Sequence, residues 1–127
     1  MTDLLSLSAR DCAALFALKA ATPIDLLEAT LARLDAVEPS VNAFAHVDRA
    51  GARRAAEESA ARHARGEAIG PADGLIATIK DNVLVQGLPN RRGTRTSPSG
   101  PMSEDSPATA RMREAGAVIL GKTTLPE

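Results

Sequence analysis

A chain of 127 residues with a net charge of -1 and a pI near 6.1 has the length of one domain. Two phenylalanines, with no tryptophan or tyrosine, leave little aromatic surface for stacking on bases, and no basic excess attracts phosphate, so we exclude nucleic acid as a partner. One cysteine and no long apolar run predict a soluble, cytoplasmic protein without an internal disulfide or a membrane span.

Residues 1–69 are predicted to be mainly helical. A Ser-x-x-Asp pattern that begins at Ser8 predicts a helix over residues 9–20, and Cys12 falls on its apolar face as a small buried side chain. A Thr-Pro pair then begins a second helix, whose leucines repeat every three or four residues and which ends near Pro39. This stripe predicts a helix that packs on an apolar core.

The third predicted helix is polar. Asp48 caps it, and it runs to about Gly66. Charged pairs lie four residues apart along it: Arg53 with Glu57, Arg54 with Glu58, and Glu58 with Arg62. We interpret this run as a solvated face and place His63 on it without a role. His46, in an extended or irregular link over residues 41–47, has no second ligand at metal spacing, so no metal site is expected.

Residues 70–127 are predicted to form a strand, a loop, a helix and a strand. Residues 75–79 are a short apolar run rich in strand-forming types, and residues 83–85 are expected to form a further short strand. A Ser-Pro pair later begins a helix, and residues 117–120 predict a second buried strand. This order favours an α/β fold with some parallel pairing.

Lys80 directly follows the first of these strands and marks its carboxyl end. In open α/β sheets, ligands and catalytic groups collect at that edge. Partial burial there would favour the neutral form of a lysine, which can accept a proton. Lys80 is therefore a candidate general base, and a solvated side chain is the alternative.

The loop over residues 87–105 carries three arginines in its first half, at Arg91, Arg92 and Arg95. Loops of this length inside a compact domain are usually functional or disordered. The arginines either bind an anionic group of a substrate, or stay solvated, or contact a part of the protein beyond this sequence.

Residues 116–123 literally fit the phosphate-binding pattern G-x-x-x-x-G-K-[ST]. A loop of that kind needs a strand before it and a helix after it, with the helix N-terminus facing phosphate. Here a helix precedes, the four intervening residues form an apolar strand, and Pro126 follows too soon for an ordinary helix. We therefore reject nucleotide binding at this motif.

The segments DGLIATIKDN, around Lys80, and REAGAVILGKT, ending at Thr123, occur in an order and at a separation that resemble the amidase signature family. The resemblance covers residues 1–127, strongly after Gly70 and weakly before it. Two segments depart from the common family pattern: residues 74–76 lack a proline, and residues 90–92 are Asn-Arg-Arg where Thr-Thr-Ala is common. These departures leave the subfamily open.

The resemblance implies the amidase signature fold, of which this chain holds N-terminal helices and the first strands of a mixed sheet. It also implies hydrolysis of a small-molecule amide by a Ser, cis-Ser and Lys triad through an acyl-enzyme. Only Lys80 of that triad carries over to this sequence, and the serines are expected in the missing C-terminal half of the same domain. The 127-residue chain alone is therefore expected to be inactive.

Other residues of the matching segments receive no chemical step. Asp81 and Asn82 match family positions beside Lys80, and the resemblance assigns Lys122 structure rather than proton transfer. No cofactor is implied, a homo-oligomer is allowed, and the amide substrate is not specified. A non-catalytic interaction module, or a truncated subunit of an amidotransferase-like assembly, is the alternative function.

Overall fold

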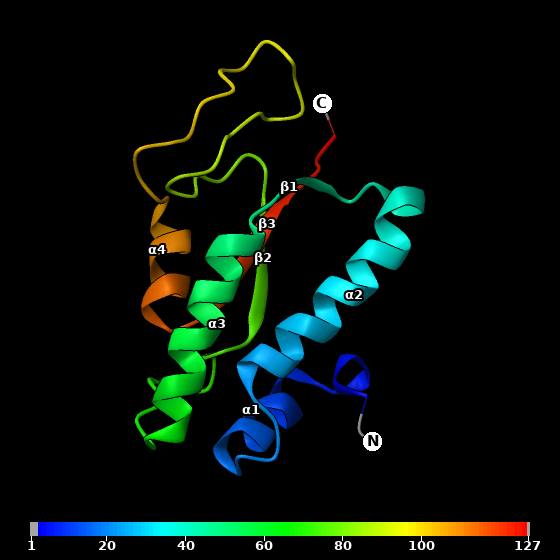
Figure 1. The fold of residues 1–127 in the computed structure, drawn as a ribbon. Helices are drawn as coiled ribbons and strands as arrows, with labels where there is room; N and C mark the ends of the chain where they lie inside the picture. The colour runs from blue at the N-terminus through cyan, green and yellow to red at the C-terminus, as the bar shows by residue number, and fades with distance from the viewer. Residues whose placement is uncertain (1–2, 127) are drawn as a thin grey trace.

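The computed structural model describes residues 3–126, which form a small sheet with helices on both faces (Figure 1). The elements in chain order are the 3₁₀ turn η1 (Leu4–Ser6), α1 (Ala9–Ala17), α2 (Pro23–Val41), β1 (Phe44–Val47), α3 (Arg49–Ala64), β2 (Ile76–Lys80), α4 (Pro107–Glu114) and β3 (Val118–Thr123). The strand order is β1-β3-β2, with β3 antiparallel to β1 and parallel to β2. The predicted α/β fold with parallel pairing is confirmed. No helix within residues 3–126 is long and apolar enough to cross a membrane.

The predicted helix starts are confirmed by their caps. Ser8 Oγ accepts a hydrogen bond from the N–H of Asp11 at 3.1 Å, which satisfies a backbone donor in the first turn of α1. Thr22 and Asp25 cap α2 reciprocally, each side chain accepting from the other residue's N–H, at 3.1 and 2.9 Å. α1 ends at Ala17, before the predicted boundary.

The end of α2 lies beyond the predicted boundary, because the helix passes through Pro39 and ends at Val41. The carboxylate of Glu38 accepts hydrogen bonds from the N–H groups of Ala43 at 2.7 Å and Phe44 at 2.8 Å. This side chain joins the helix end to β1.

The core lies on both faces of β3. On one face, its buried residues pack with those of α2 and α3: Leu27, Leu31, Leu34, Ala52, Ala56, Val118 and Leu120. On the other face, Ile119 packs with Ile79, Val85 and Leu88, and Met112 of α4 covers this cluster. β3 therefore holds the two layers together, and the prediction of a buried strand is confirmed there. The same prediction for residues 75–79 is wrong, because β2 lies at the edge of the described sheet and only its Ile79 is buried.

Cys12 lies in a third cluster with Phe16 and Leu26 and is 4% exposed, as predicted. Burial, together with the negative charge of Asp11, raises the pKa of its thiol. A thiol in this environment stays protonated and acts as a small apolar side chain.

The link over residues 41–47 contributes a strand, β1, that the sequence left as extended or irregular. Pairing with β1 extends β3 to Thr123, beyond the predicted end at residue 120. Gly121 permits the close approach, because a Cβ atom there would overlap the carbonyl oxygen of His46. A helix precedes β3, so the geometry of a phosphate-binding loop is absent from residues 116–123.

The predicted strand over residues 83–85 is wrong, because this segment has no strand neighbour in the described part of the chain. The Leu84 N–H donates to Ser106 Oγ at 2.8 Å, and the Gln86 N–H donates to Asp105 Oδ1 at 2.7 Å. Side chains just before α4 thus satisfy backbone donors that a neighbouring strand would otherwise satisfy. Ser106 consequently makes no side-chain cap for α4, although it occupies the predicted N-cap position.

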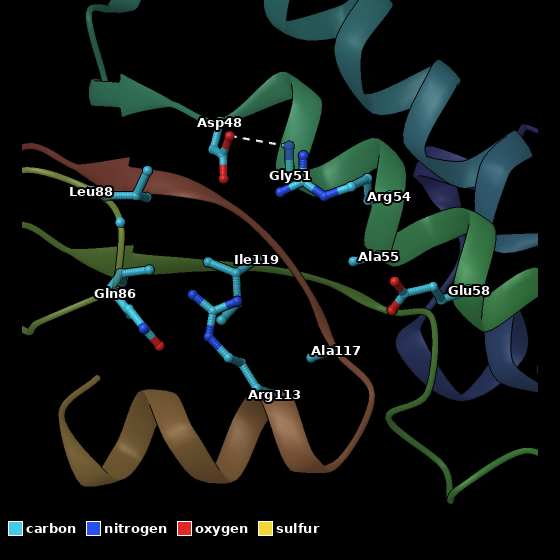
Figure 2. Close-up of a pocket in the computed structure, with 12 residues that line it drawn as sticks. Asp48, Gly51, Arg54, Ala55, Glu58, Gln86, Leu88, Arg113, Ala117 and Ile119 are labelled. Carbon is cyan, nitrogen blue, oxygen red and sulfur yellow. Dashed lines mark hydrogen bonds between the residues drawn. The ribbon is translucent and has the colours of Figure 1, made fainter. Parts of the chain in front are cut away.

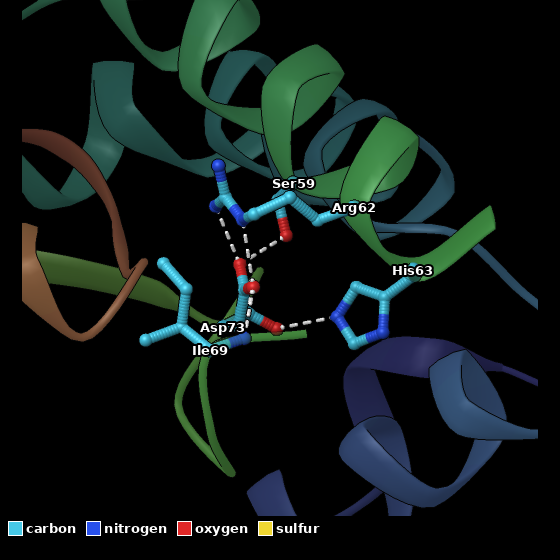
Figure 3. A network of polar contacts seen from close by, with 5 residues as sticks. All are labelled: Ser59, Arg62, His63, Ile69 and Asp73. Carbon is cyan, nitrogen blue, oxygen red and sulfur yellow. Dashed lines mark hydrogen bonds and ion pairs between the residues drawn. The ribbon is translucent and has the colours of Figure 1, made fainter. Parts of the chain in front are cut away.

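A buried polar network holds the loop that enters β2 against the end of α3 (Figure 3). Arg62 donates to both carboxylate oxygens of Asp73, at 2.8 and 2.6 Å, and Ser59 Oγ donates to the same carboxylate at 2.6 Å. The Ile69 N–H adds a bond of 3.0 Å. His63 Nε2 lies 2.9 Å from the Asp73 carbonyl oxygen, which can only accept, so Nε2 carries the proton.

Burial alone would raise the pKa of Asp73, whose side chain is 0% exposed, but its hydrogen bonds outweigh that cost. Donation from Arg62, from Ser59 and from the Ile69 N–H lowers the pKa to about 2. The carboxylate is therefore ionised and saturated with donors at neutral pH. Gly116 lies against it at a φ of +86°, and a Cβ atom there would come within 2.5 Å of Asp73 Oδ1.

The network corrects the interpretation of α3 as a solvated charged face. Arg62 pairs with Asp73 rather than with Glu58, and Arg53 forms an ion pair with Glu28 of α2. His63 is half-buried, and its ring centroid lies 5.4 Å from that of Phe16. The spacing of residues within one helix could not show that another loop and another helix supply closer partners.

Candidate functional site

Lys80 is the last residue of β2, at the carboxyl end of the parallel pair, as predicted. It lies beside Thr123 of β3, and β2 has no second strand neighbour among residues 3–126. Its side chain is exposed. This end of β2 is an open sheet edge in the described chain, and the partial burial expected of Lys80 in the intact protein stays a prediction.

Lys122, one residue before Thr123, has the opposite environment and is fully buried. Its register partner is Ile79, so Lys122 and Lys80 belong to opposite faces of the sheet. Lys122 Nζ lies 3.3 Å from Asp81 Oδ1, and the Asp81 side chain is 3% exposed. The two lysines at neighbouring strand ends thus differ in both burial and pairing.

The loop after β2 closes around this ion pair. Lys122 Nζ donates to the carbonyl oxygen of Pro89 at 3.2 Å and to Asn90 Oδ1 at 3.0 Å. The Asp81 N–H donates to the Thr123 carbonyl at 2.9 Å and continues the β2–β3 ladder past Lys80. These contacts fix the backbone on the C-terminal side of Lys80.

The family resemblance assigns Lys122 to structure, but sequence reasoning missed its buried pair with Asp81. A signal was present. Lys122 lies inside an apolar strand, and Asp81 follows the neighbouring parallel strand, so the carboxyl ends bring the two charges together. Asn82 matches the motif but is exposed, and the structure gives it no contact with Lys80.

An apolar groove runs along the face of β2 that ends at Lys80. Ile76 and Thr78 line it, and because side chains alternate along a strand, Lys80 continues the same row. The opposite wall comes from α2, with Leu34, Val37 and Val41, and from Phe44 at the start of β1. Within the described residues, Lys80 therefore lies at the end of an uncovered apolar surface.

A second cavity lies between α3, α4 and the loop over residues 85–88 (Figure 2). Arg54 of α3 and Arg113 of α4 line it from opposite sides, and the apolar side chain of Ile119 lies between them in this view. Glu58 also lines it, and Arg113 donates to Asp105 at 2.8 Å, so its charges are largely balanced. Ile119 pairs in register with Ala77, on the face of β2 opposite to Lys80, so this cavity is not the predicted site.

Neither a cofactor nor a metal takes part in the predicted chemistry. Among residues 3–126, no three His, Cys, Asp or Glu side chains gather closely enough to hold a metal ion. His46, at an exposed position of β1, pairs in register with Lys122 rather than with another metal-ligand type.

The fold and the position of Lys80 define an α/β protein whose polar groups collect at the carboxyl edge of a parallel strand pair. Comparison with known proteins narrows this class. The family model described as Amidase matches residues 25–127. The chain belongs to the amidase signature family.

Relatives of this chain include both amidotransferase subunits and amidases. A glutamyl-tRNA(Gln) amidotransferase subunit of Salinispora arenicola is 41% identical over 127 residues, which are 100% of this chain and 26% of that protein. The acylamidase of Rhodococcus erythropolis is 38% identical over 121 residues, 95% of this chain and 25% of the relative. The chain thus spans about a quarter of the length of these relatives.

Solved structures that resemble this chain include an amidase. The peptide amidase from Stenotrophomonas maltophilia superposes with a TM-score of 0.88 at 27% identity, over 94% of this chain and 25% of that one. The sheet and helices described above therefore correspond to one part of a larger amidase fold.

Proposed function

We propose that the protein carrying this sequence hydrolyses a carboxylic amide to the acid and ammonia or an amine, with Lys80 as the general base. The observation that carries the proposal is the position of Lys80. It ends β2 at the carboxyl edge of the parallel pair, inside the KDN segment of a chain that belongs to the amidase signature family.

The proposed chemistry needs two serines that the family places further along the chain. Neutral Lys80 accepts a proton from the cis-Ser hydroxyl, which in turn takes the proton of the nucleophilic Ser. The nucleophilic oxygen attacks the amide carbonyl, the C–N bond breaks, and the leaving nitrogen takes a proton. Water then hydrolyses the acyl-enzyme, releases the acid and restores the serine.

The environment of Lys80 supports this role in two ways. The buried pair of Asp81 and Lys122 fixes the backbone beside it without engaging its side chain. The apolar groove along Ile76 and Thr78 leads to it, and covering that groove would remove water from Lys80 and favour its neutral form. A buried lysine that already holds an ion pair, as Lys122 does, is a poorer base.

The test is ammonia release from a panel of aliphatic and aromatic amides by the full-length gene product. We expect turnover of at least one amide. Turnover should fall by about 100-fold or more in Lys80→Ala, the usual range for loss of a general base. No turnover of any amide by the folded protein would contradict the proposal.

A second candidate function is a component of an amidotransferase-like assembly, or a non-catalytic interaction module. The observation that favours it is the 41% identity with a glutamyl-tRNA(Gln) amidotransferase subunit. The residues that follow Glu127 in the intact gene product discriminate between the two. A Gly/Ser-rich segment with two suitably spaced serines supports catalysis, and its absence supports an interaction role.

A further inference from the structure

A cavity beside Asp81 collects the arginines of the loop that follows β2. Its lining residues are Ala45, Asp81, Arg91, Gly93, Thr94, Arg95, Thr124 and Leu125. It lies at the carboxyl edge of the sheet, between the loop and the segment that leaves β3. Asp81, which follows Lys80 directly, is part of its wall.

Backbone hydrogen bonds hold both walls of this cavity in place. The N–H groups of Arg91 and Arg92 donate to Asp81, at 3.4 Å to its carboxylate and at 3.2 Å to its carbonyl. The Thr124 N–H donates to the carbonyl of Ala43 at 2.8 Å, which fixes the opposite wall beside β1. The arginines therefore project from anchored backbone rather than from a free loop.

The charge of the cavity is not balanced. The carboxylate of Asp81 is compensated by Lys122, which lies 3.3 Å away behind the cavity. Neither Arg91 nor Arg95 forms an ion pair with any residue in the described range 3–126. Two arginines therefore line the same cavity without an ion-pair partner, and such an arrangement attracts anions.

The two arginines differ in burial, and Arg91 is the more enclosed of the pair. Among the buried side-chain nitrogens and oxygens of residues 3–126, Arg91 Nε alone has no hydrogen-bond partner. Leaving a buried donor without an acceptor destabilises the fold, and more so for a charged group. The other arginine of the cavity, Arg95, is exposed. An oxyanion bound between Arg91 and Arg95 would accept from the accessible nitrogens of their guanidinium groups and neutralise their charge.

We propose that this cavity binds the oxyanion of a small ligand, a carboxylate or a phosphate, through Arg91 and Arg95. The planar guanidinium fork matches either group, and Thr94 and Thr124 add hydroxyls to the wall. The site lies at the same edge of the sheet as Lys80, but its assignment goes beyond the proposed amidase function, because amide hydrolysis requires no anion.

The experiment is isothermal titration calorimetry of the full-length gene product with succinate, with inorganic phosphate and with neutral succinamide. We expect saturable binding of succinate or phosphate and none of succinamide, and the tighter anion identifies the group. Arg91→Gln should weaken that binding by about tenfold or more, and Arg95→Gln should weaken it to a smaller extent. The control Arg10→Gln, an exposed position on α1, removes the same charge elsewhere and should leave the affinity unchanged.

Arg91→Lys sharpens the test, because it keeps the charge but removes the fork, and it should also weaken binding. Circular dichroism checks that each variant is folded, and Arg95→Gln decides the matter if changes at Arg91 prevent folding. Absence of saturable binding would overturn the proposal, as would equal weakening by Arg10→Gln or unchanged affinity in the folded Arg variants. Calorimetry needs no turnover, so its result is separable from failure of the amidase proposal.

Discussion

The two ends of β2 each place a buried carboxylate beside the strand, but they satisfy it differently. At the entrance, Asp73 receives two bonds from Arg62 and one each from Ser59 and the Ile69 N–H. At the exit, Asp81 has one cation, at 3.3 Å, and one backbone donor, at 3.4 Å.

We interpret this difference as one between a structural end of β2 and the end that carries the proposed base. Around Asp73, every charged group has a partner and the network is closed. Around Asp81, the neighbouring Lys80 is exposed and Arg91 Nε has no acceptor. A buried donor without an acceptor, such as Arg91 Nε, destabilises a fold unless another group satisfies it, whereas the exposed Lys80 is hydrated. We therefore expect changes at the entrance to alter stability and changes at the exit to alter both stability and activity.

The largest expected effect is complete loss of turnover in the 127-residue chain taken alone. Lys80 has no serine pair to activate in that chain, so no acyl-enzyme can form. The measurement is ammonia release from amides by the purified chain, with Lys80→Ala of the same chain as a control for contaminants. Turnover by the chain that disappears in Lys80→Ala would contradict this prediction, because it would show that Lys80 needs no groups from outside the 127 residues.

Lys122→Met should have the next largest effect, because it leaves Asp81 buried at 3% side-chain exposure without its counter-ion. Breaking a buried pair by removing one partner costs about 3–5 kcal/mol. Urea unfolding of the full-length gene product measures this loss. The double variant Asp81→Asn with Lys122→Met removes both charges and should recover most of it. A loss below about 1 kcal/mol in the single variant would show that the pair is not structural.

The smallest of the three effects is the pH dependence that Asp73 gives to the free energy of unfolding. Its pKa is about 2 in the folded protein against an ordinary value of 3.8. Because the folded value is the lower one, the stabilisation is complete above the unfolded pKa and is lost as the pH falls from about 4 to about 2. At about 1.36 kcal/mol per pKa unit, the contribution is about 2 kcal/mol.

Urea unfolding between about pH 4 and about pH 2 measures this pH dependence of the free energy of unfolding. Asp73→Asn should remove the contribution and flatten the fall in stability. Asp35→Asn is a matched control, because Asp35 pairs with Arg49 at a side chain that is 62% exposed, and it should leave the fall intact. The same fall in Asp73→Asn as in the wild type would show that other groups cause it.

Local chemistry made part of the fold predictable from the sequence. Capping patterns at Ser8 and Thr22 fixed the helix starts, since a cap depends on residues only three apart. Strand ends were less predictable, because pairing with a distant segment extends β3 to Thr123. The false strand at residues 83–85 has the same origin, because side chains before α4 satisfy its backbone.

The candidate site also combines features that depend on nearby residues with features that depend on distant segments. The position of Lys80 at a strand end followed from the apolar run before it, and the predicted parallel pairing placed it at the ligand-binding edge. The exposure of Lys80 did not follow, because burial depends on which neighbouring segments cover the strand. The pairing of Arg62 with Asp73 was also missed, because a loop reversal brings these residues together.

The most direct test of Lys80 as the base compares Lys80→Ala with Lys122→Ala in the full-length gene product, measuring amide turnover and thermal midpoint for both. The Lys80 side chain forms no ion pair within residues 3–126, so its replacement should leave the midpoint nearly unchanged while turnover falls by about 100-fold or more. Lys122 is fully buried, so its replacement should act mainly by lowering the midpoint. Near-normal turnover in Lys80→Ala, or loss of turnover only in a fully folded Lys122→Ala, would contradict the assignment of Lys80 as the base.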